Sequence, residues 1–324
     1  MKTPWNWNKQ VHTEVVELKP LFRSGYKVGG VLIMATVELK NKKISAIISL
    51  LGAEIQSVTR IDDGFDYIWN DTTGKYWGRH APVLFPIIGQ INQNTYYFDG
   101  HKYGLTQHGF LRDQTFEIVS QSQDAVVLKS AANADTKAKF PFDYQVTISY
   151  RLDDSALKVE YNVENLDQKT MYYSLGLHPG FNTTGDFANY RLKFDPAVTE
   201  LENQEVDPAP LLSGKTHMVK LTDGEYGLSH DKLDAGLIVF SAKGLKHVQL
   251  VSDEAKHAVE LNLNDFPYFA IWSPEKKNAD FVCVEPFNGL PDVYGDPEQL
   301  QDKKAVNTLA AGKTDVFGTE IKFS

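Results

Sequence analysis

The chain has 324 residues, of which 42% are hydrophobic, enough for a large core. Its formal net charge of −9 disfavours a nucleic-acid or anionic-membrane partner, which calls for a basic surface, and no run of about 18 apolar residues predicts a membrane span. The single cysteine, Cys283, excludes an internal disulfide framework and a cysteine-based zinc site, and we expect a cytoplasmic protein.

Residues 1–33 differ from the rest of the chain. They lack the basic-then-apolar pattern of a secretory signal, and Met34 opens a clean strand pattern that continues through Ala35–Leu39. We therefore expect residues 1–33 to be an N-terminal extension or an added leader, a choice that the sequence leaves open. Residues 34–324 are expected to form one domain.

Beyond residue 34 the dominant hydrophobic period is two residues, which is typical of half-buried strands. Residues 144–163 predict a β-hairpin, with turn residues at Asp153–Ser155. Strand–helix alternation is absent, and only 296–303 and 306–311 suggest short helical turns, so a parallel α/β fold is disfavoured. Residues 200–215, rich in proline and acids, are interpreted as a surface loop. The prediction is an all-β protein, one large antiparallel β-sandwich.

Further strands are expected at 43–50, 53–59, 125–130, 171–177, 236–241, 246–251, 268–273 and 280–285.

The segment Leu-Gly-Leu-His-Pro-Gly-Phe-Asn, residues 175–182, predicts a strand that presents His178 and then ends. By alternation Ser174, Gly176 and His178 share one face, and the small residues leave room for a ligand or for close backbone approach. Pro179 removes the next ladder donor and keeps His178 extended, so the strand stops there. The alternative is a hydrogen-bonded structural histidine at the rim of a sheet.

A second strand, Val-Cys-Val-Glu-Pro-Phe-Asn-Gly, residues 282–289, presents Glu285 in the same way. Phe281, Cys283 and Glu285 share a face, so we expect the carboxyl group to be at least partly buried. Burial raises a carboxyl pKa and makes the group a better base near neutral pH. The alternative is a rim glutamate paired with a basic residue. Cys283 is interpreted as a small buried hydrophobe.

Two loop-rich stretches supply further polar groups. Arg79 can donate several hydrogen bonds to hydroxyls, a ring oxygen or a phosphate, and His108 lies beside a glycine that leaves it open to a ligand. For Arg112 an ion pair with Asp113 or Glu117 is expected rather than a ligand contact. No HExxH, GxSxG, GxxxxGKS/T or GxGxxG motif is present, so zinc-protease, serine-hydrolase and nucleotide-binding functions lack support. Three scattered histidines and a glutamate could bind a metal in principle, but the sequence does not show that they converge in space, so we expect neither a metal nor a cofactor.

Four motifs, in this order, resemble the aldose 1-epimerase (galactose mutarotase) family, and most closely its LacX-like branch. They are Arg79 before Pro-Val-Leu-Phe-Pro, Gln-His-Gly-Phe-Leu-Arg around His108, Leu-His-Pro-Gly-Phe-Asn around His178, and Val-Glu-Pro-Phe-Asn-Gly around Glu285. The similarity covers roughly residues 36–323. It implies a galactose mutarotase-like β-supersandwich, in agreement with the period-two pattern.

The resemblance implies an isomerase that interconverts the α and β anomers of a hexose or hexose phosphate without a cofactor. His178 matches the general acid that protonates the ring oxygen, and Glu285 the base that takes the C1-hydroxyl proton. A neighbouring carboxylate is expected to raise the pKa of His178. The matched sugar-binding residues are Arg79, His108, Asp234 and Trp272. For Trp272 an ordinary core tryptophan is the equal alternative.

Two other functions stay open. One is a sugar-binding or regulatory protein without turnover. The other is a glycoside hydrolase or lyase on a similar scaffold, although hydrolysis normally needs two carboxylates about 5–10 Å apart and one motif here supplies only one. Gly180-Phe181 departs from the aromatic residue that many family members carry after the His-Pro pair. The identity of the sugar and the oligomeric state do not follow from the sequence.

Overall fold

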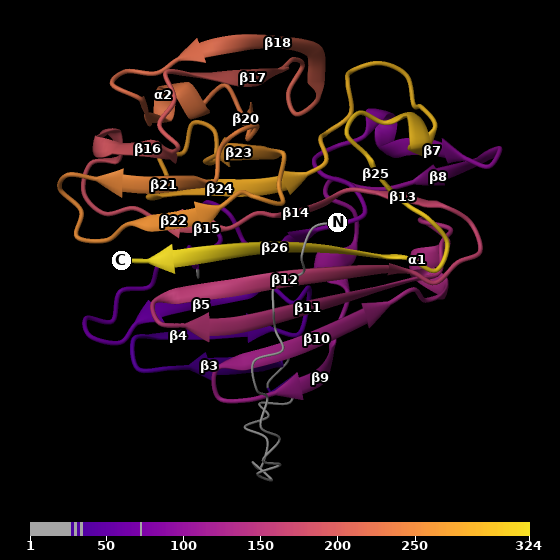
Figure 1. The fold of residues 1–324 in the computed structure, drawn as a ribbon, viewed down its shortest axis with the longest axis horizontal. Helices are drawn as coiled ribbons and strands as arrows, with labels where there is room; N and C mark the ends of the chain where they lie inside the picture. The colour runs from indigo at the N-terminus through magenta and orange to yellow at the C-terminus, as the bar shows by residue number, and fades with distance from the viewer. Residues whose placement is uncertain (1–26, 29–30, 33–34, 72) are drawn as a thin grey trace.

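The computed structural model describes residues 27–28, 31–32, 35–71 and 73–324, so the interpretation of residues 1–33 lies almost entirely outside them. From residue 35 onward the described chain is mostly antiparallel sheet, which confirms the all-β prediction (Figure 1). Its α-helices are single turns, α1 (Ala134–Lys137) and α2 (His230–Leu233). No helix in this part of the chain has the length and hydropathy of a membrane span.

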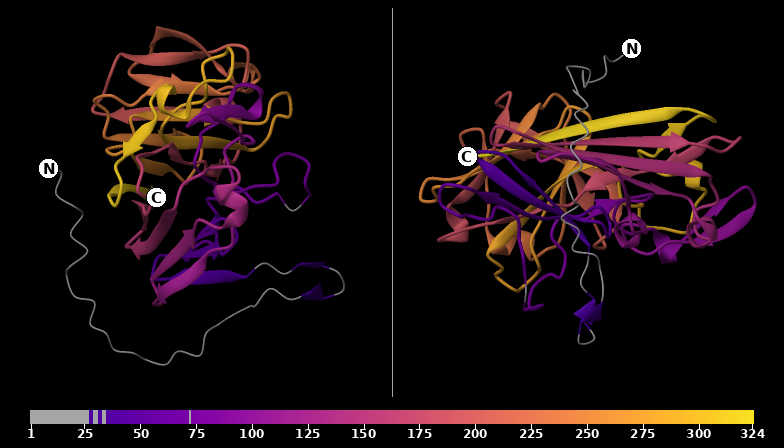
Figure 2. Two further views of the ribbon diagram at one scale, coloured as in Figure 1. Left: turned by 90° about the vertical axis from the view of Figure 1, so that its right-hand side faces the viewer. Right: turned by 90° about the horizontal axis from the view of Figure 1, so that it is seen from below.

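Two large sheets dominate the fold, and Figures 1 and 2 show them as two layers. The nine-stranded sheet has the order β19 (Glu225–Gly227), β16 (Tyr190–Asp195), β21 (His247–Ser252), β22 (Val259–Asn262), β26 (Thr314–Phe323), β12 (Ala156–Asn165), β11 (Tyr144–Asp153), β10 (Ala125–Ala131) and β9 (Glu117–Gln121). The eight-stranded sheet has the order β18 (Leu212–Lys220), β17 (Glu200–Val206), β20 (Ile238–Ser241), β23 (Tyr268–Trp272), β24 (Phe281–Asn288), β14 (Leu175–Leu177) and β6 (Val83–Leu84), and β15 (Gly180–Asn182) also pairs with β24.

Smaller elements complete the fold. They are the sheet β3 (Thr36–Lys40), β4 (Ile44–Ser49) and β5 (Ile55–Arg60); the pairs β13 (Met171–Tyr173) with β25 (Asn307–Leu309), β7 (Thr95–Phe98) with β8 (His101–Gly104), and β1 (Lys27–Val28) with β2 (Val31–Leu32); and the 3₁₀ turns η1 (Asn92–Asn94), η2 (Leu111–Asp113), η3 (Phe187–Asn189) and η4 (Leu300–Asp302).

The core lies between the two large sheets, where side chains of both interdigitate. Phe194 of β16, for example, packs on Phe269 of β23 with ring centroids 6.0 Å apart. The predicted hairpin at 144–163 is present as β11 and β12, whose register closes at Asp153↔Ala156 around a two-residue turn. Alternation along these strands places every second side chain in the core, which is why the period-two pattern located them.

Two local predictions were wrong. Residues 200–215 are not simply a surface loop, because β17 and the start of β18 form an edge hairpin with pairs such as Glu200↔Lys220. Residues 306–311 are not helical, because β25 pairs with β13. Backbone pairing decided both cases: the side chains of 200–215 are largely polar, and the short segment 306–311 has no alternating pattern, so hydrophobic periodicity did not indicate a strand in either.

Candidate active site

The two faces of β24 have different surroundings, and this difference creates the site. Val282 and Val284 point into the core between the sheets. Cys283 and Phe281 point to the opposite face, where they pack with aromatic residues that include Trp77 and Trp272. Glu285 follows Cys283 by two residues, so its carboxyl group is on the same face. The strand therefore delivers one carboxyl group beneath an aromatic cluster.

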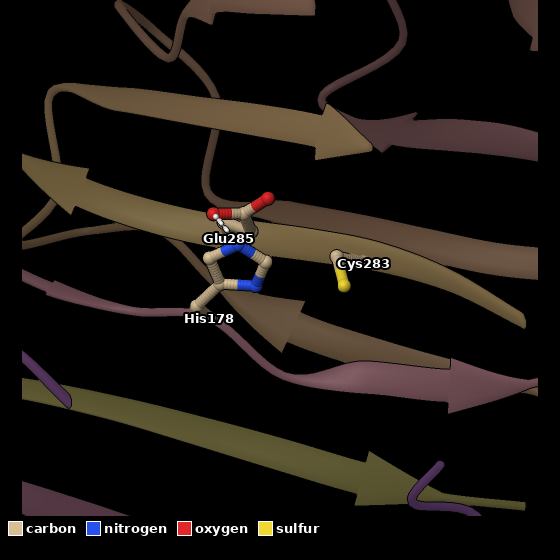
Figure 3. Close-up of side chains that lie close together, drawn as sticks. All are labelled: His178, Cys283 and Glu285. Carbon is tan, nitrogen blue, oxygen red and sulfur yellow. Dashed lines mark ion pairs between the residues drawn. The ribbon is translucent and has the colours of Figure 1, made fainter. Parts of the chain in front are cut away.

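His178 lies opposite Glu285 because of the strand register. β14 pairs Gly176 with Phe287, and β15 pairs Gly180 with Cys283. Residue 178 lies midway between Gly176 and Gly180, so the same register places it directly opposite residue 285. Directly opposed residues project their side chains on one face. The result is a contact of 3.3 Å between His178 Nε2 and Glu285 Oε2, marked by the dashed line in Figure 3.

The pair is buried and lacks hydrogen-bond partners within the described chain. His178 is 7% exposed and Glu285 is 0% exposed. Neither carboxylate oxygen of Glu285 makes a hydrogen bond, and neither does His178 Nδ1. Buried polar atoms in folded proteins normally make hydrogen bonds, so three neighbouring atoms without a partner require an explanation. A polar ligand placed among them would supply the missing hydrogen bonds.

Burial also fixes the charge state of the pair. Desolvation raises the pKa of Glu285 well above its usual value. Desolvation, with a smaller contribution from the positive charge of Arg112, lowers the pKa of His178 to about 3. The expectation that the carboxylate raises the histidine pKa was therefore wrong, because the carboxyl group is itself held neutral by burial. Burial therefore favours the neutral form of each group, an imidazole beside a carboxylic acid.

Two tryptophans enclose the imidazole. The ring of Trp77 stacks on His178 at a centroid distance of 4.8 Å and an interplanar angle of 29°. Trp272 meets His178 edge-to-face at 5.7 Å. Gly180 makes the approach of Trp77 possible, because a Cβ there would lie 3.2 Å from the indole and 3.0 Å from Trp69. The glycine after the His-Pro pair thus leaves room for these indole groups.

His108 approaches from a third segment, with its ring edge-to-face to His178 at 5.4 Å. The backbone N–H of His108 donates to the Gly89 carbonyl at 2.7 Å, and the backbone N–H of Gly89 donates to the ring nitrogen Nδ1 of His108 at 3.1 Å. Burial lowers the pKa of His108 well below its usual value, so the ring is neutral. Since Nδ1 is an acceptor, the ring proton is on Nε2. His108 is thereby prepared to donate one hydrogen bond.

Arg79 belongs to a network beside this group. Its guanidinium donates to Asp113 at 2.5 Å and to the Arg112 carbonyl at 3.2 Å. Glu54, buried and 3.8 Å from Arg79, accepts hydrogen bonds from the backbone N–H groups of His80 and Ala81. Glu54 therefore holds the segment that carries Arg79.

The contacts of Arg112 differ from the prediction. No ion pair joins it to Asp113 or Glu117, all three of which are described; instead it donates to the Gln107 carbonyl at 2.8 Å. Its Nε is buried and makes no hydrogen bond within the described chain. Its positive charge lowers the pKa of both His108 and His178. Arg112 therefore contributes positive potential at the histidine pair.

Asp234 lies further out. It follows α2, and its Oδ1 accepts a hydrogen bond of 2.6 Å from the Lys276 N–H in the loop after β23. The Nε1 group of Trp272 donates to Glu275 in the same loop, at 3.0 Å. Asp234 is thus connected to the loop beside Trp272, and no contact among the described residues joins it to His178 or Glu285.

Of the sequence-predicted site residues, the structure gathers His178, Glu285, His108 and Trp272 into one cluster and places Arg79 in the adjoining network. Sequence reasoning missed Trp77 and Glu54 as members of the site. Trp77 stands two residues before Arg79, so its position was a usable signal. Glu54 had none, because its partners are backbone groups more than twenty residues away.

Comparison with known proteins places this geometry in context. A family model described as aldose 1-epimerase matches residues 35–317. Protein LacX (chromosomal) of Lactococcus lactis subsp. lactis is 28% identical over 295 residues, which cover 85% of this chain and 94% of LacX.

Solved structures agree. A galactose mutarotase-like protein from Lactobacillus casei ATCC 334 superposes with a TM-score of 0.87 and 36% identity, covering 89% of this chain and 100% of that chain. A galactose mutarotase related enzyme from Lactobacillus acidophilus superposes with a TM-score of 0.84 and 29% identity, covering 89% and 97%. These superpositions confirm the predicted galactose mutarotase-like sandwich.

Proposed function

The chain belongs to the aldose 1-epimerase family, and on this premise we propose that it is a mutarotase that interconverts the anomers of a hexose or hexose phosphate. The observation that carries the proposal is the buried, unpartnered His178–Glu285 pair. Its separation of 3.3 Å suits a reaction at two oxygens bonded to the same carbon, the C1 hydroxyl oxygen and the ring oxygen. Proximity and orientation of this kind are a principal source of rate enhancement.

In the proposed reaction Glu285 as carboxylate takes the C1-hydroxyl proton while protonated His178 gives its proton to the ring oxygen. The bond between C1 and the ring oxygen breaks, and the aldehyde forms. Rotation about the bond from C1 to C2 presents the other face of the carbonyl. Reclosure reverses both proton transfers and yields the other anomer. Each positioned proton transfer contributes about 10²–10⁴-fold.

The charge state of the pair fits this cycle. After ring opening Glu285 carries the proton and His178 is neutral, which is the state that burial favours in the free protein. The ionised state needed for opening differs only by transfer of one proton across the pair. Sugar hydroxyls entering the site supply hydrogen bonds that the carboxylate lacks and so stabilise its charge. The pair therefore shares a single catalytic proton.

For the sugar itself, we propose that His108 donates from Nε2 to a sugar oxygen and that Trp272 packs on the sugar face. We propose that Arg79 and Asp234 are outer contacts to sugar hydroxyl groups. Each can bind the sugar once its present hydrogen bonds are released. Arg112 is a stronger candidate than Arg79, because its Nε is unpartnered while the guanidinium of Arg79 is engaged with Asp113. Guanidinium groups bind oxygen-rich and anionic ligands well.

A phosphorylated hexose is the second candidate substrate, and Arg112 is the specific observation in its favour. A cation that depresses the pKa of two neighbouring histidines also attracts an anionic group. If the substrate carries a phosphate, Arg112→Gln raises KM for the phosphorylated sugar much more than for the free sugar. Equal effects on both sugars would favour the unphosphorylated substrate.

The testing experiment is NMR of the anomeric protons, or polarimetry, on freshly dissolved α-glucose, α-galactose and their 6-phosphates. Wild type is compared with His178→Asn, Glu285→Gln and a blank without protein. We expect acceleration by wild type and a loss of about 10²-fold or more in each variant, with folding verified by circular dichroism. Full activity in either variant would reject the role given to that residue.

A sugar-binding assay and a glycoside substrate, used with the same proteins, separate the alternatives. Saturable sugar binding without acceleration, on free and phosphorylated sugars alike, would favour a sugar-binding protein. Release of a free sugar from a glycoside would favour a hydrolase or lyase. Both outcomes would overturn the mutarotase proposal while leaving family membership intact.

A further inference from the structure

The candidate site brings together the side chains of a histidine, a cysteine and a glutamate. One ligand atom from each of His178, Cys283 and Glu285 lies within 4.8 Å of the other two. Figure 3 shows the thiol and the carboxyl group projecting from β24 on the side of the imidazole. The strand register explains the convergence, because residues 283 and 285 share one face and residue 178 lies across from it.

These three donors match the ligand preferences of zinc. Zinc sites with chemical function commonly use three protein ligands from histidine, cysteine and carboxylate and leave a fourth position open. With bond lengths of about 2.0–2.3 Å, tetrahedral ligand atoms lie about 3.3–3.6 Å apart. The separation of 3.3 Å between His178 Nε2 and Glu285 Oε2 meets this spacing. The remaining separations are at most 4.8 Å, so binding requires the side chains to move closer together.

No hydrogen bond within the described chain competes for these donors. Both carboxylate oxygens of Glu285 are buried and make no hydrogen bond, Cys283 is completely buried, and His178 Nε2 has only its 3.3 Å contact with Glu285 Oε2 among the described residues. A sugar hydroxyl would satisfy the oxygens and nitrogen but gains little from the sulfur. A divalent cation would use all three side chains, because a metal-coordinated thiol is deprotonated and becomes a strong ligand.

We propose that His178, Cys283 and Glu285 bind a borderline or soft divalent cation, with Zn²⁺ and Cd²⁺ the best matches, and that the bound cation blocks the acid–base pair. The thiolate selects these ions over Mg²⁺ and Ca²⁺, which prefer oxygen ligands. On binding, the metal replaces the proton of the Cys283 thiol and the proton of the Glu285 carboxyl group, and both protons leave to solvent. The blocking effect rests on the proposed function, whereas the binding itself does not.

Cobalt provides a direct test, because a thiolate bound to Co²⁺ absorbs in the near ultraviolet. Cys283 is the only cysteine in the chain, so any such band reports this site alone. We expect wild type to show the band with one Co²⁺ per chain and to lose it on addition of Zn²⁺ but not of Mg²⁺. Absence of the band, or displacement by Mg²⁺, would overturn the proposal.

Variants make the assignment specific. Cys283→Ser and, should it fold poorly, Cys283→Ala are expected to lose the band and to weaken Zn²⁺ binding in calorimetry by at least about 100-fold, since even an indirect partner of a ligand contributes about 10–100-fold. His247→Ala is the matched control, because it removes a histidine that pairs with Asp195 away from the site. Wild-type Zn²⁺ affinity in both cysteine variants would reject the site.

The blocking effect is measured separately. Zn²⁺ is expected to slow anomer exchange by wild type, and each cysteine variant, compared with its own rate without metal, is expected to be about 100-fold less sensitive. A Co²⁺ band without any anomer exchange would reject the proposed function and keep the metal site. Anomer exchange without a band would keep the function and reject the site.

Discussion

Asp292 and Lys303 form a buried ion pair next to the loop that orients His108. The Lys303 ammonium contacts both carboxylate oxygens of Asp292, at 2.6 and 2.7 Å, and neither residue is more than 9% exposed. The same carboxylate accepts from the Asn92 N–H, and the Asp292 N–H donates to the Gln90 carbonyl. Gln90 follows Gly89, whose N–H holds His108 Nδ1. The ion pair therefore anchors the segment that fixes the tautomer of His108.

Removing one member of this pair should be costly. We expect Asp292→Asn to lower the free energy of unfolding by about 3–5 kcal/mol, because it leaves the Lys303 ammonium buried without its counter-charge. The double variant Asp292→Asn/Lys303→Met should recover part of the loss. Urea unfolding provides the measurement.

The control is Asp154→Asn, which breaks an exposed pair with Lys43 and should leave stability close to that of wild type. Equal destabilisation by Asp292→Asn and Asp154→Asn would contradict the special weight given to the buried pair.

Trp77 is expected to hold the imidazole of His178, the proposed acid, in position. Trp77→Leu removes the stack on His178 at 4.8 Å, and aromatic pairs of this kind contribute about 0.5–1.5 kcal/mol. If that energy orients His178 for proton transfer, kcat for anomer exchange should fall by about 2- to 12-fold. Trp77→Phe, which keeps an aromatic face, should recover most of the rate. A Trp77→Leu variant with wild-type kcat would show that the stack does not position the acid.

The sequence identified both residues of the proposed acid–base pair because their signals are local. His178 and Glu285 each end a period-two strand next to a proline, and the family resemblance identifies both residues. What it could not predict depends on the register between distant strands. The pairing of Gly180 with Cys283 fixes the contact of His178 with Glu285, and this register links segments about a hundred residues apart.

Charge states were also beyond the sequence. A carboxyl group beside a histidine predicts a raised histidine pKa only if the carboxyl group is ionised. Complete burial of Glu285 reverses that outcome, and burial on this scale depends on which aromatic side chains cover the pair. Likewise, Arg112 was expected to pair with Asp113 or Glu117, but Arg79 pairs with Asp113 and Lys129 lies 3.8 Å from Glu117. Competition between two arginines for one acid is decided by tertiary geometry.

Gly109 is required for the close approach of the His108 segment to β6. Its φ is +70°, and an added Cβ would lie 2.3 Å from the Phe85 carbonyl oxygen. Gly100 has a similar φ of +74° but open space around it. Both alanine variants incur the cost of a left-handed backbone, about 1–2 kcal/mol, and Gly109→Ala adds overpacking of about 1–3 kcal/mol. Thermal or urea unfolding should therefore show that Gly109→Ala is clearly less stable than Gly100→Ala. Equal losses of stability would mean that the backbone around Gly109 shifts to accommodate the added Cβ.

The two buried groups also predict how stability depends on pH. The folded pKa of His178 is lowered, so its contribution to stability is present above about pH 6.5 and is lost as pH falls toward 3. The folded pKa of Glu285 is raised, so its contribution is present below about pH 4.5 and is lost as pH rises. Between pH 4.5 and 6.5 the unfolded chain carries one proton on the pair, and so does the folded chain. The two dependences should therefore cancel in wild type.

Single variants remove the cancellation. In His178→Asn only Glu285 titrates, so between pH 4.5 and 6.5 the free energy of unfolding should fall with rising pH, relative to wild type, by on the order of 1 kcal/mol per unit. In Glu285→Gln only His178 titrates, and the relative slope should have the opposite sign. Urea unfolding at pH 5.0, 5.5, 6.0 and 6.5 measures all three proteins against the same background of surface groups. Parallel curves would mean that burial does not shift these pKa values. That result would contradict the neutral state assigned to the pair.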